Sequence, residues 1–315
     1  MTYSFKGSKE LFTRAARVIP QGIYGHLTPV FTVPGSYPYY VSRAKGSRFW
    51  DVDGNEFIDY MCAYGPMILG YGYKKVDEAF LRQARKGACT TIASPLSVEL
   101  AEKIVEVNDC ADWVIFGKNG ADATSIALVL ARGYTGREKI VLAHQGYHGS
   151  QPWAGTNSVG ITPADTRNIL MVPWGDLDAF SKIVGTHKDR IAGAMFTPYH
   201  HPVFDDQKLP DPDFWPAMRR ICDREGIVLI IDDVRAGWRL DLKGSGHFFG
   251  IRPDLACYSK AMANGYALSA IVGTETMRIV ASKLYAAGSF WFNSPEMAAA
   301  LVCIDELIAI DALRS

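Results

Sequence analysis

One lysine of the sequence lies where an amine nucleophile could work. Lys260 comes two residues after the apolar run 255–258, and mostly small residues and Gly265 follow it. Small neighbours leave room for a bulky group. Partial burial would lower the pKa of the amine and make it able to form a Schiff base. The plainer interpretation is a surface lysine in a loop, which describes most lysines.

Two adjacent carboxylates end an unbroken aliphatic run. Asp232 and Asp233 follow residues 227–231. A carboxylate held there can bind a cation, such as a protonated pyridine nitrogen or a metal ion, or it can cap a helix. A metal would need further ligands at suitable spacing, and the sequence offers none nearby. The adjacent pair His200 and His201 would point apart on a strand, so we interpret them as loop residues that can touch a substrate.

A glycine turn precedes the predicted helix that begins at residue 122. Asn119, Gly120 and Ala121 form this turn. The free backbone N–H groups at a helix start can bind a phosphate. Such turns are common, and Asp122 can simply interact favourably with the helix dipole. The turn is therefore a weak signal by itself.

An aromatic residue and a histidine follow the apolar run 139–143. They are Tyr147 and His148, and a glycine stands on either side of the pair. An aromatic ring at a strand end can stack on a planar ligand. Most aromatic residues in such places belong to the core instead, so the position of this pair relative to the other motifs decides its interpretation.

From about residue 97 onward, predicted strands alternate with predicted helices. The helix-like segments are 97–107, 122–132, 175–185 and 212–225. The strand-like runs are 113–116, 139–143, 169–172, 193–196, 227–232, 255–258 and 269–272. This alternation predicts an α/β fold with a mostly parallel seven-stranded sheet sandwiched by helices. Ligands of such sheets bind beyond the carboxyl ends of the strands, where all four motifs stand, and this convergence is a stronger signal than any single motif.

The N-terminal part follows another pattern. Residues 8–19 have apolar side chains at helical spacing, and a Gly, Pro and Tyr-rich stretch covers 20–40. Residues 48–59 predict a β-hairpin with Asp53-Gly54 as its turn. We expect residues 20–40 to form an arm or a substrate-facing loop.

The composition excludes several classes of protein. The chain has 315 residues, with 33 Lys+Arg against 33 Asp+Glu, which argues against a nucleic-acid or membrane-surface partner. Its six cysteines form no CxxC pair, which disfavours a zinc ribbon or a redox dithiol and indicates reduced thiols. No apolar run reaches the roughly 20 residues of a membrane span, and the N-terminus lacks a signal-peptide core. We therefore expect a cytoplasmic protein.

Together these motifs resemble the class III, fold-type I pyridoxal-phosphate-dependent aminotransferases. The likeness is closest to the glutamate-1-semialdehyde aminomutase-like branch and covers nearly the whole chain. The matching segments are 43–54, 58–60, 65–70, 119–124, 147–149, 232–234, Lys260 and 288–300. The order and spacing of the motifs make the resemblance specific.

The resemblance implies a role for each motif around pyridoxal phosphate. Lys260 takes the place of the Schiff-base lysine, which later moves a proton as general acid and base. Asp232 takes the place of the carboxylate that keeps the pyridine nitrogen protonated, and Val234 ends the same motif. Tyr147, followed by His148, takes the place of the aromatic residue that stacks on the cofactor ring.

The resemblance also implies a homodimer. Asn119, Gly120 and Ala121 match the family's phosphate loop. The hydroxyl of Ser289 takes the place of one that reaches the phosphate of the partner subunit's cofactor.

Several positions depart from the family pattern. Ala121 and Asp122 replace Thr and Glu, so one hydroxyl is lost, and Thr197 replaces a glutamate after the strand 193–196. Phe31 falls near the arginine that takes the substrate carboxylate in the aminomutases. Arg235 could replace that arginine, or it could be a plain salt-bridged residue. The aromatic and imidazole side chains nearby predict a more aromatic pocket: Tyr24, His26, Tyr199, His200, Trp291 and Phe292.

The resemblance divides the chain into three parts. Residues 1–60 are the N-terminal helix, arm and hairpin, and 61–293 are the cofactor-binding large domain. Residues 294–315 begin a helix that leads, in the family, to a C-terminal small domain. We expect this domain to be missing from the chain.

The predicted function is that of a pyridoxal-phosphate-dependent aminotransferase acting on a small amino donor and a keto or aldehyde acceptor. An aminomutase and an amino-acid racemase or epimerase would use the same motifs and stay open, and a decarboxylase is allowed. From another class, the chain could be a non-catalytic homologue that serves as a scaffold or partner subunit.

Overall fold

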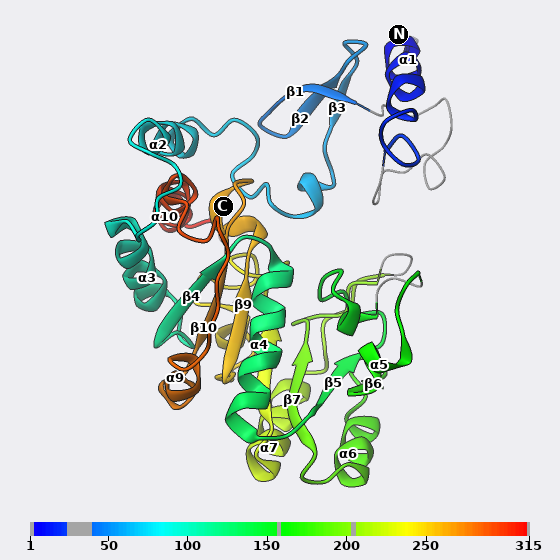
Figure 1. Cartoon of the computed structure of the whole chain (residues 1–315), viewed down its shortest axis with the longest axis vertical. Coiled ribbons are helices and arrows are strands. Elements are labelled where there is room, and N and C mark those ends of the chain that lie inside the picture. Colours follow the sequence, from blue (N-terminus) through cyan, green and yellow to red (C-terminus); the bar gives the residue numbers. More distant parts are fainter. Residues whose placement is uncertain (1–2, 24–39, 156–158, 203–205, 314–315) are drawn as a thin grey trace. The chain divides into compact units, whose positions relative to one another are not determined.

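The computed structural model describes residues 3–23, 40–155, 159–202 and 206–313 (Figure 1). The chain forms two compact units, Met1–Lys74 and Lys75–Ser315, and each has its own sheet. The predicted division at 60/61 and 293/294 rests on expected roles rather than on compactness, so these functional domains stay a prediction. The expected loss of a further C-terminal domain also stays a prediction.

The first unit is built on the predicted hairpin and one further strand. β2 (Arg48–Asp51) and β3 (Glu56–Ile58) pair antiparallel on either side of Asp53-Gly54, as predicted. β1 (Val41–Lys45) pairs antiparallel with β2 and completes a three-stranded sheet. Its residues are mostly polar and exposed, so the sequence showed no alternation that would have marked this strand.

The N-terminal helix is anchored to the hairpin turn. α1 (Lys6–Ala15) begins two residues before the predicted start and gives way to turns from residue 16. The backbone N–H groups of Gly7 and Ser8 donate to the two carboxylate oxygens of Asp53, at 2.6 and 2.9 Å. A carboxylate at a helix N-terminus satisfies free donors and interacts favourably with the helix dipole. This contact explains why the helix starts earlier than its apolar pattern indicated. A short turn, η2 (Cys62–Tyr64), follows the sheet.

The second unit contains the predicted seven-stranded sheet, in the order β4-β10-β9-β8-β7-β5-β6. The strands are β4 (Trp113–Gly117), β5 (Lys139–Ala143), β6 (Ile169–Val172), β7 (Ile191–Phe196), β8 (Val228–Asp232), β9 (Leu255–Tyr258) and β10 (Ser269–Gly273). β10 runs opposite to the other six, so the sheet is mostly parallel, as predicted. Every residue of β5, β7, β8, β9 and β10 is buried, which requires cover on both faces.

Helices provide this cover. From residue 74 onward they are α2 (Lys74–Ala84), α3 (Pro95–Val107), α4 (Gly120–Thr135), α5 (Pro163–Thr166), α6 (Leu177–Thr186), α7 (Phe214–Glu225), α8 (Ser245–Phe248), α9 (Glu275–Ala281) and α10 (Ser294–Ala309), with the short turns η3 (Pro152–Ala154) and η4 (Lys260–Ala263). α4 lies across the sheet in Figure 1 and contacts β7 through β10. It leads from β4 to β5, whereas α6 and α7 lead back from β6 to β8. Because parallel crossovers are right-handed, α6 and α7 lie on the opposite face from α4.

The core of this unit lies between α4 and the sheet. Ala127, Leu130 and Ala131 of α4 are completely buried against strand residues such as Ile230 and Ile271. Such close packing keeps the strand ends in fixed relative positions. The polar residues that follow these ends therefore stand on a rigid platform.

Candidate active site

Four of the predicted motifs leave the same edge of the sheet. β4, β5, β8 and β9 all run in one direction. Residues 119–121 follow β4, residues 147–149 follow β5, Asp232 ends β8, and Lys260 follows β9. The carboxyl edge of a parallel sheet is where ligands of such folds bind. The structure thus brings these motifs to the edge that the sequence indicated.

The Asp232 carboxylate is buried and held at both oxygens. Its Oδ2 atom lies 2.7 Å from Nδ1 of His148, and its Oδ1 accepts a hydrogen bond from the backbone N–H of Val234 at 3.1 Å. His148 Nε2 is buried and finds no partner among the described residues. A proton on Nε2 would be a buried donor without a partner and would leave Nδ1 with nothing to donate to the carboxylate. We therefore assign the imidazole proton to Nδ1, which donates it to Asp232. His148 thereby fixes the orientation of a negative charge.

The start of α4 offers free backbone donors beside this carboxylate. Asp122 Oδ2 accepts from the backbone N–H groups of Lys118 and Asn119, at 2.9 and 2.8 Å. The next two N–H groups, of Gly120 and Ala121, begin the helix and have no backbone acceptor in the described part of the chain. They form an anion site of the kind found at helix N-termini.

Gly120 is required where α4 meets the loop after β8. A Cβ atom on Gly120 would lie 2.7 Å from Cγ1 of Val234, which is closer than real side chains approach. The glycine therefore lets the helix start pack directly against the residue that donates to Asp232. In this way the predicted phosphate loop and the predicted ring-nitrogen partner form one unit.

The loop after β5 is fastened to the same helix. Thr124 Oγ1 donates to the carbonyl oxygen of His148 at 2.8 Å. Gly149 has a φ of 117° and approaches Ala121 so closely that a Cβ atom would lie 2.8 Å from that alanine's Cβ. Tyr147 is 45% exposed, and its ring stacks on no other ring of the described residues. Its ring is therefore accessible for stacking on a ligand.

Lys260 has a strained backbone and a perturbed amine. Its φ is 44°, in the left-handed region that residues other than glycine seldom adopt. Strain of this kind concentrates at functional sites, where the surrounding structure imposes it. Burial lowers the pKa of Lys260, and the charges of Arg235 and Arg239 lower it further, while Asp232 acts in the opposite direction. A larger fraction of the amine is thus neutral and nucleophilic.

Two further side chains join this group. Arg235 Nη1 lies 3.2 Å from Nδ1 of His201, in the loop that follows β7. Burial and then the charge of Arg235 lower the pKa of His201 to about 4, while Asp232 raises it and Lys260 adds the smallest lowering effect. The sequence singled out both residues but did not pair them. Arg239, which donates to the carbonyl of Arg235 at 3.3 Å, was missed, although its spacing of four residues from Arg235 was a signal.

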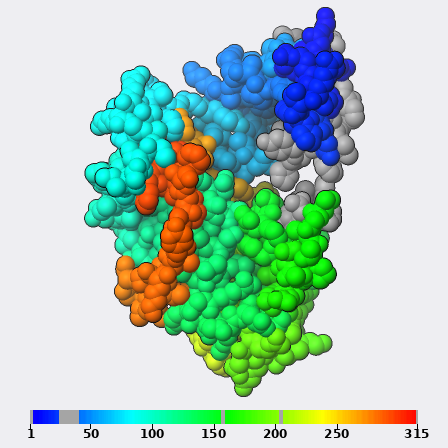
Figure 2. All heavy atoms as spheres, viewed as in Figure 1, coloured from blue at the N-terminus to red at the C-terminus, as the bar shows by residue number. Residues whose placement is uncertain are grey.

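Ser289 is not joined to the other predicted site residues. Among the described residues, no hydrogen bond or ion pair connects it with Lys260 or Asp232 of the same chain. Its carbonyl accepts a hydrogen bond from Cys89 Sγ at 3.3 Å. Ser289 lines an open, largely apolar groove of about 810 Å³, together with α3, β4 and Trp291. Figure 2 shows the orange surface of this late segment running beside the blue-green surface of α3 and β4.

These residues fit pyridoxal phosphate. The group needs an amine for its aldehyde, a carboxylate for its ring nitrogen and donors for its phosphate. Lys260, the buried Asp232 and the free N–H groups of Gly120 and Ala121 provide these at one edge of the sheet. Within the described ranges, no three His, Cys, Asp or Glu side chains gather as a metal site would require.

Comparison with known proteins establishes the family. The Aminotransferase class-III family matches residues 32–162 and 179–314, so the chain belongs to this family. The aminopentol aminotransferase of Sphingopyxis macrogoltabida is 42% identical over 293 residues, which cover 93% of this chain and 69% of that enzyme. The 3-aminobutyryl-CoA aminotransferase of Cloacimonas acidaminovorans is 39% identical over 302 residues, covering 95% and 72%. Relatives named glutamate-1-semialdehyde 2,1-aminomutase match as well.

A solved structure agrees with this assignment. The pyridoxal-phosphate form of the FumI protein of Sphingopyxis sp. MTA144 superposes with a TM-score of 0.93 and 41% identity, over 96% of this chain and 72% of that one. The predictions of the fold, the family, the cofactor pyridoxal phosphate and an aminotransferase are therefore confirmed. Among the described helices, none has the length and apolar character needed to cross a membrane.

Proposed function

We propose that Lys260 and Asp232 carry the chemistry of this class III aminotransferase. The supporting observation is the buried Asp232 carboxylate, fixed by His148 Nδ1 at 2.7 Å, at the same edge of the sheet as the perturbed amine of Lys260. The donor is a small amino acid or amine, and the acceptor is a keto or aldehyde compound.

The residues divide the work of amino transfer. Pyridoxal phosphate, when bound, supplies the electron sink that weakens the bonds of the substrate's amino carbon. Asp232 would place its carboxylate at the ring nitrogen, and His148 orients that carboxylate through the 2.7 Å contact with Nδ1. Lys260 Nζ would hold the cofactor at rest and, once released, would take a proton from the amino carbon of the substrate and deliver it, as general acid, to the aldehyde-derived carbon of the cofactor. The N–H groups of Gly120 and Ala121 hold the phosphate.

Two other reactions fit the same residues. An aminomutase would return the amino group to the same molecule, and the relatives that carry this name favour it as the second candidate. A racemase would return the proton to the opposite face of the amino carbon. These reactions differ in the path of the proton and in whether a keto product leaves, neither of which depends on Lys260 or Asp232 alone.

The visible absorbance of the purified protein tests the proposal. With pyridoxal phosphate added, we expect a yellow band that bleaches when one donor from a panel of amino acids and amines converts the cofactor to its amine form. A band that no donor bleaches would favour a racemase or a non-catalytic scaffold, and exchange of the donor's α-hydrogen in deuterated water would separate these two. Failure to take up the cofactor at all would overturn the proposal.

We also propose a homodimer in which Ser289 serves the neighbour's site. Its absence from the Lys260 and Asp232 group of its own chain supports this arrangement, as does the groove of about 810 Å³ that it lines. Sedimentation should give a dimer. Ser289→Ala should weaken cofactor binding without dissociating the dimer.

A cytoplasmic location completes the proposal. The functional division at residues 60/61 and 293/294 would be tested by limited proteolysis.

A further inference from the structure

Arg235 carries a positive charge that no carboxylate of the described residues balances. Among the described residues, no ion pair includes Arg235, and the hydrogen bond of its side chain is with His201. A guanidinium has five N–H donors. His201 Nδ1 accepts from one of them, and holding the others partly out of water without an acceptor costs free energy. The unused donors of this guanidinium can therefore bind an anionic ligand.

His201 holds this guanidinium in place. The imidazole is buried at 9% exposure, and its Nδ1 faces Arg235 Nη1 at 3.2 Å. An arginine can only donate, so Nδ1 must be the unprotonated nitrogen and His201 must be neutral. Burial and then the charge of Arg235 lower the pKa of His201 to about 4, with a further small lowering by Lys260, and outweigh the raising effect of Asp232. This low pKa keeps His201 neutral at physiological pH.

The position of Arg235 links it to the reacting amine. Arg235 comes three residues after Asp232, in the turn that leaves β8. Its charge is close enough to lower the pKa of Lys260, as is that of Arg239. Arg239 donates to the carbonyl of Arg235 at 3.3 Å, so two guanidinium groups share this turn. An anionic group bound here would lie near the amino group on which Lys260 acts.

We infer that Arg235, positioned by His201, recognises a carboxylate of the amino substrate. A planar guanidinium matches a carboxylate with two parallel hydrogen bonds, and the pairing is stronger where water is partly excluded. The substrate class is therefore an amino acid rather than a simple amine. This inference rests on the proposed function, because it concerns the substrate of the same site.

Matched pairs of donors test the inference. Alanine, β-alanine and 4-aminobutyrate are compared with their amides, which keep the amine and lose the negative charge. The rate at which each donor bleaches the cofactor band is measured in the wild type, Arg235→Gln and Arg235→Lys. We expect the best amino acid to lose about tenfold to hundredfold in Arg235→Gln, in line with the loss of a charge-assisted hydrogen bond, and its amide to change little. Arg235→Lys should recover part of the rate.

A binding measurement separates this inference from the proposed function. In Lys260→Ala no turnover occurs, and calorimetry can follow binding of the same amino acid with and without Arg235→Gln. Weaker binding only when Arg235 is replaced supports recognition of the carboxylate. His201→Gln, which keeps an acceptor, should retain more of this binding than His201→Leu.

Two results would overturn the inference. An equal loss for the amino acid and its amide would mean that Arg235 only supports the fold. A wild-type enzyme that prefers the amides would mean that the site rejects carboxylates. If no donor reacts with the wild type at all, the proposed function fails instead, and the calorimetry on Lys260→Ala still reports on Arg235.

Discussion

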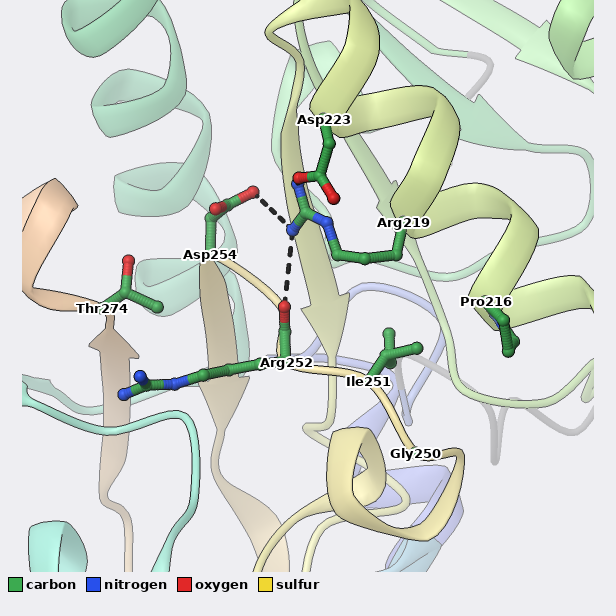
Figure 3. A pocket seen from close by; sticks show the side chains of 8 residues that line it. All are labelled: Pro216, Arg219, Asp223, Gly250, Ile251, Arg252, Asp254 and Thr274. Atoms are coloured by element: carbon green, nitrogen blue, oxygen red, sulfur yellow. Dashed lines mark hydrogen bonds and ion pairs between the residues drawn. The ribbon is translucent and has the colours of Figure 1, made fainter.

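At the amino edge of the large sheet, positive charges are matched by carboxylates. Arg219 on α7 reaches Asp254 at 2.8 Å and Asp223 at 2.7 Å (Figure 3). Arg252 pairs with Asp112 at 2.9 Å. At the carboxyl edge, Lys260 and Arg235 have no carboxylate within ion-pair distance in the described part of the chain. Two buried carboxylates lie nearby, and both are already bonded: Asp232 to His148 and Asp233 to Ser245.

The contrast separates charge that holds the fold from charge kept for a ligand. The hollow of about 430 Å³ at the amino edge is lined by Arg219 with its partners Asp223 and Asp254, and by Arg252, so it is part of the structure of the fold. The carboxyl edge keeps a neutral histidine and two guanidinium groups around an amine. Folds tolerate such an excess of positive charge where a negatively charged ligand binds. Replacing residues at each edge should therefore affect different properties.

Lys260→Ala should give the largest effect, at the carboxyl edge. Removing both the covalent attachment and the proton carrier should lower turnover by about 10⁴-fold or more. The free energy of unfolding should change little, because the amine makes no ion pair with the described residues. Single-turnover bleaching and urea unfolding measure the two properties. Lys243→Ala, at an exposed lysine paired loosely with Asp109 at 3.8 Å, is the matched control and should leave both unchanged. Turnover that survives in Lys260→Ala would end the proposed mechanism.

Arg219→Met should give the opposite outcome, at the amino edge. Asp254 would lose its main partner while still accepting the backbone N–H of Leu229 at 2.7 Å. Breaking a buried pair costs about 3–5 kcal/mol, and the partial exposure of Asp254 reduces this to about 2–3 kcal/mol of unfolding free energy. The turnover number of the folded protein should stay near that of the wild type. A variant that kept its stability but lost activity would contradict the division between the two edges.

The fold was predictable because its signals are local. Each buried strand, such as β8, is a short apolar run that one window of sequence reveals, and the motifs follow those runs directly. The direction of β10 carries no such signal, since a buried strand looks the same in either sense. β1 escaped notice because its exposed residues lack alternation.

The pairing of charges was less predictable than the site itself. Arg235 and His201 are 34 residues apart, and only the packing of two strands brings them together. The sequence left open whether Arg235 is salt-bridged, because that question depends on which carboxylates lie nearby in space. The partner of Asp232 was equally hidden, since His148 is 84 residues away along the chain.

Gly120→Ala should have a smaller effect that stays at the carboxyl edge. The new Cβ would lie 2.7 Å from Cγ1 of Val234, and overpacking of this kind costs about 1–3 kcal/mol. The start of α4 must then move, so the affinity for pyridoxal phosphate should fall together with stability. Val234→Ala combined with Gly120→Ala should restore both, because it removes the opposing methyl groups. Gly136→Ala serves as a control, since no atom lies near its added Cβ, although its φ of 68° makes a small loss of stability expected there.

The smallest expected effect is the contribution of His201 to the pH dependence of stability. Its pKa is lowered from 6.5 to about 4, so the folded protein holds it neutral while the unfolded chain protonates it. The stability that neutral His201 contributes is complete above about pH 6.5 and is lost as the pH falls toward about 4. Lowering the pH from 7.5 to 5.5 should therefore cost the wild type about 1 kcal/mol more than His201→Gln. Burial raises the pKa of Asp233 to about 6, with the opposite trend in this range, and its effect cancels in the difference because both proteins contain it. Equal pH profiles in urea unfolding would show that His201 has the same pKa in the folded and unfolded chain, so the fold would not hold it neutral beside Arg235.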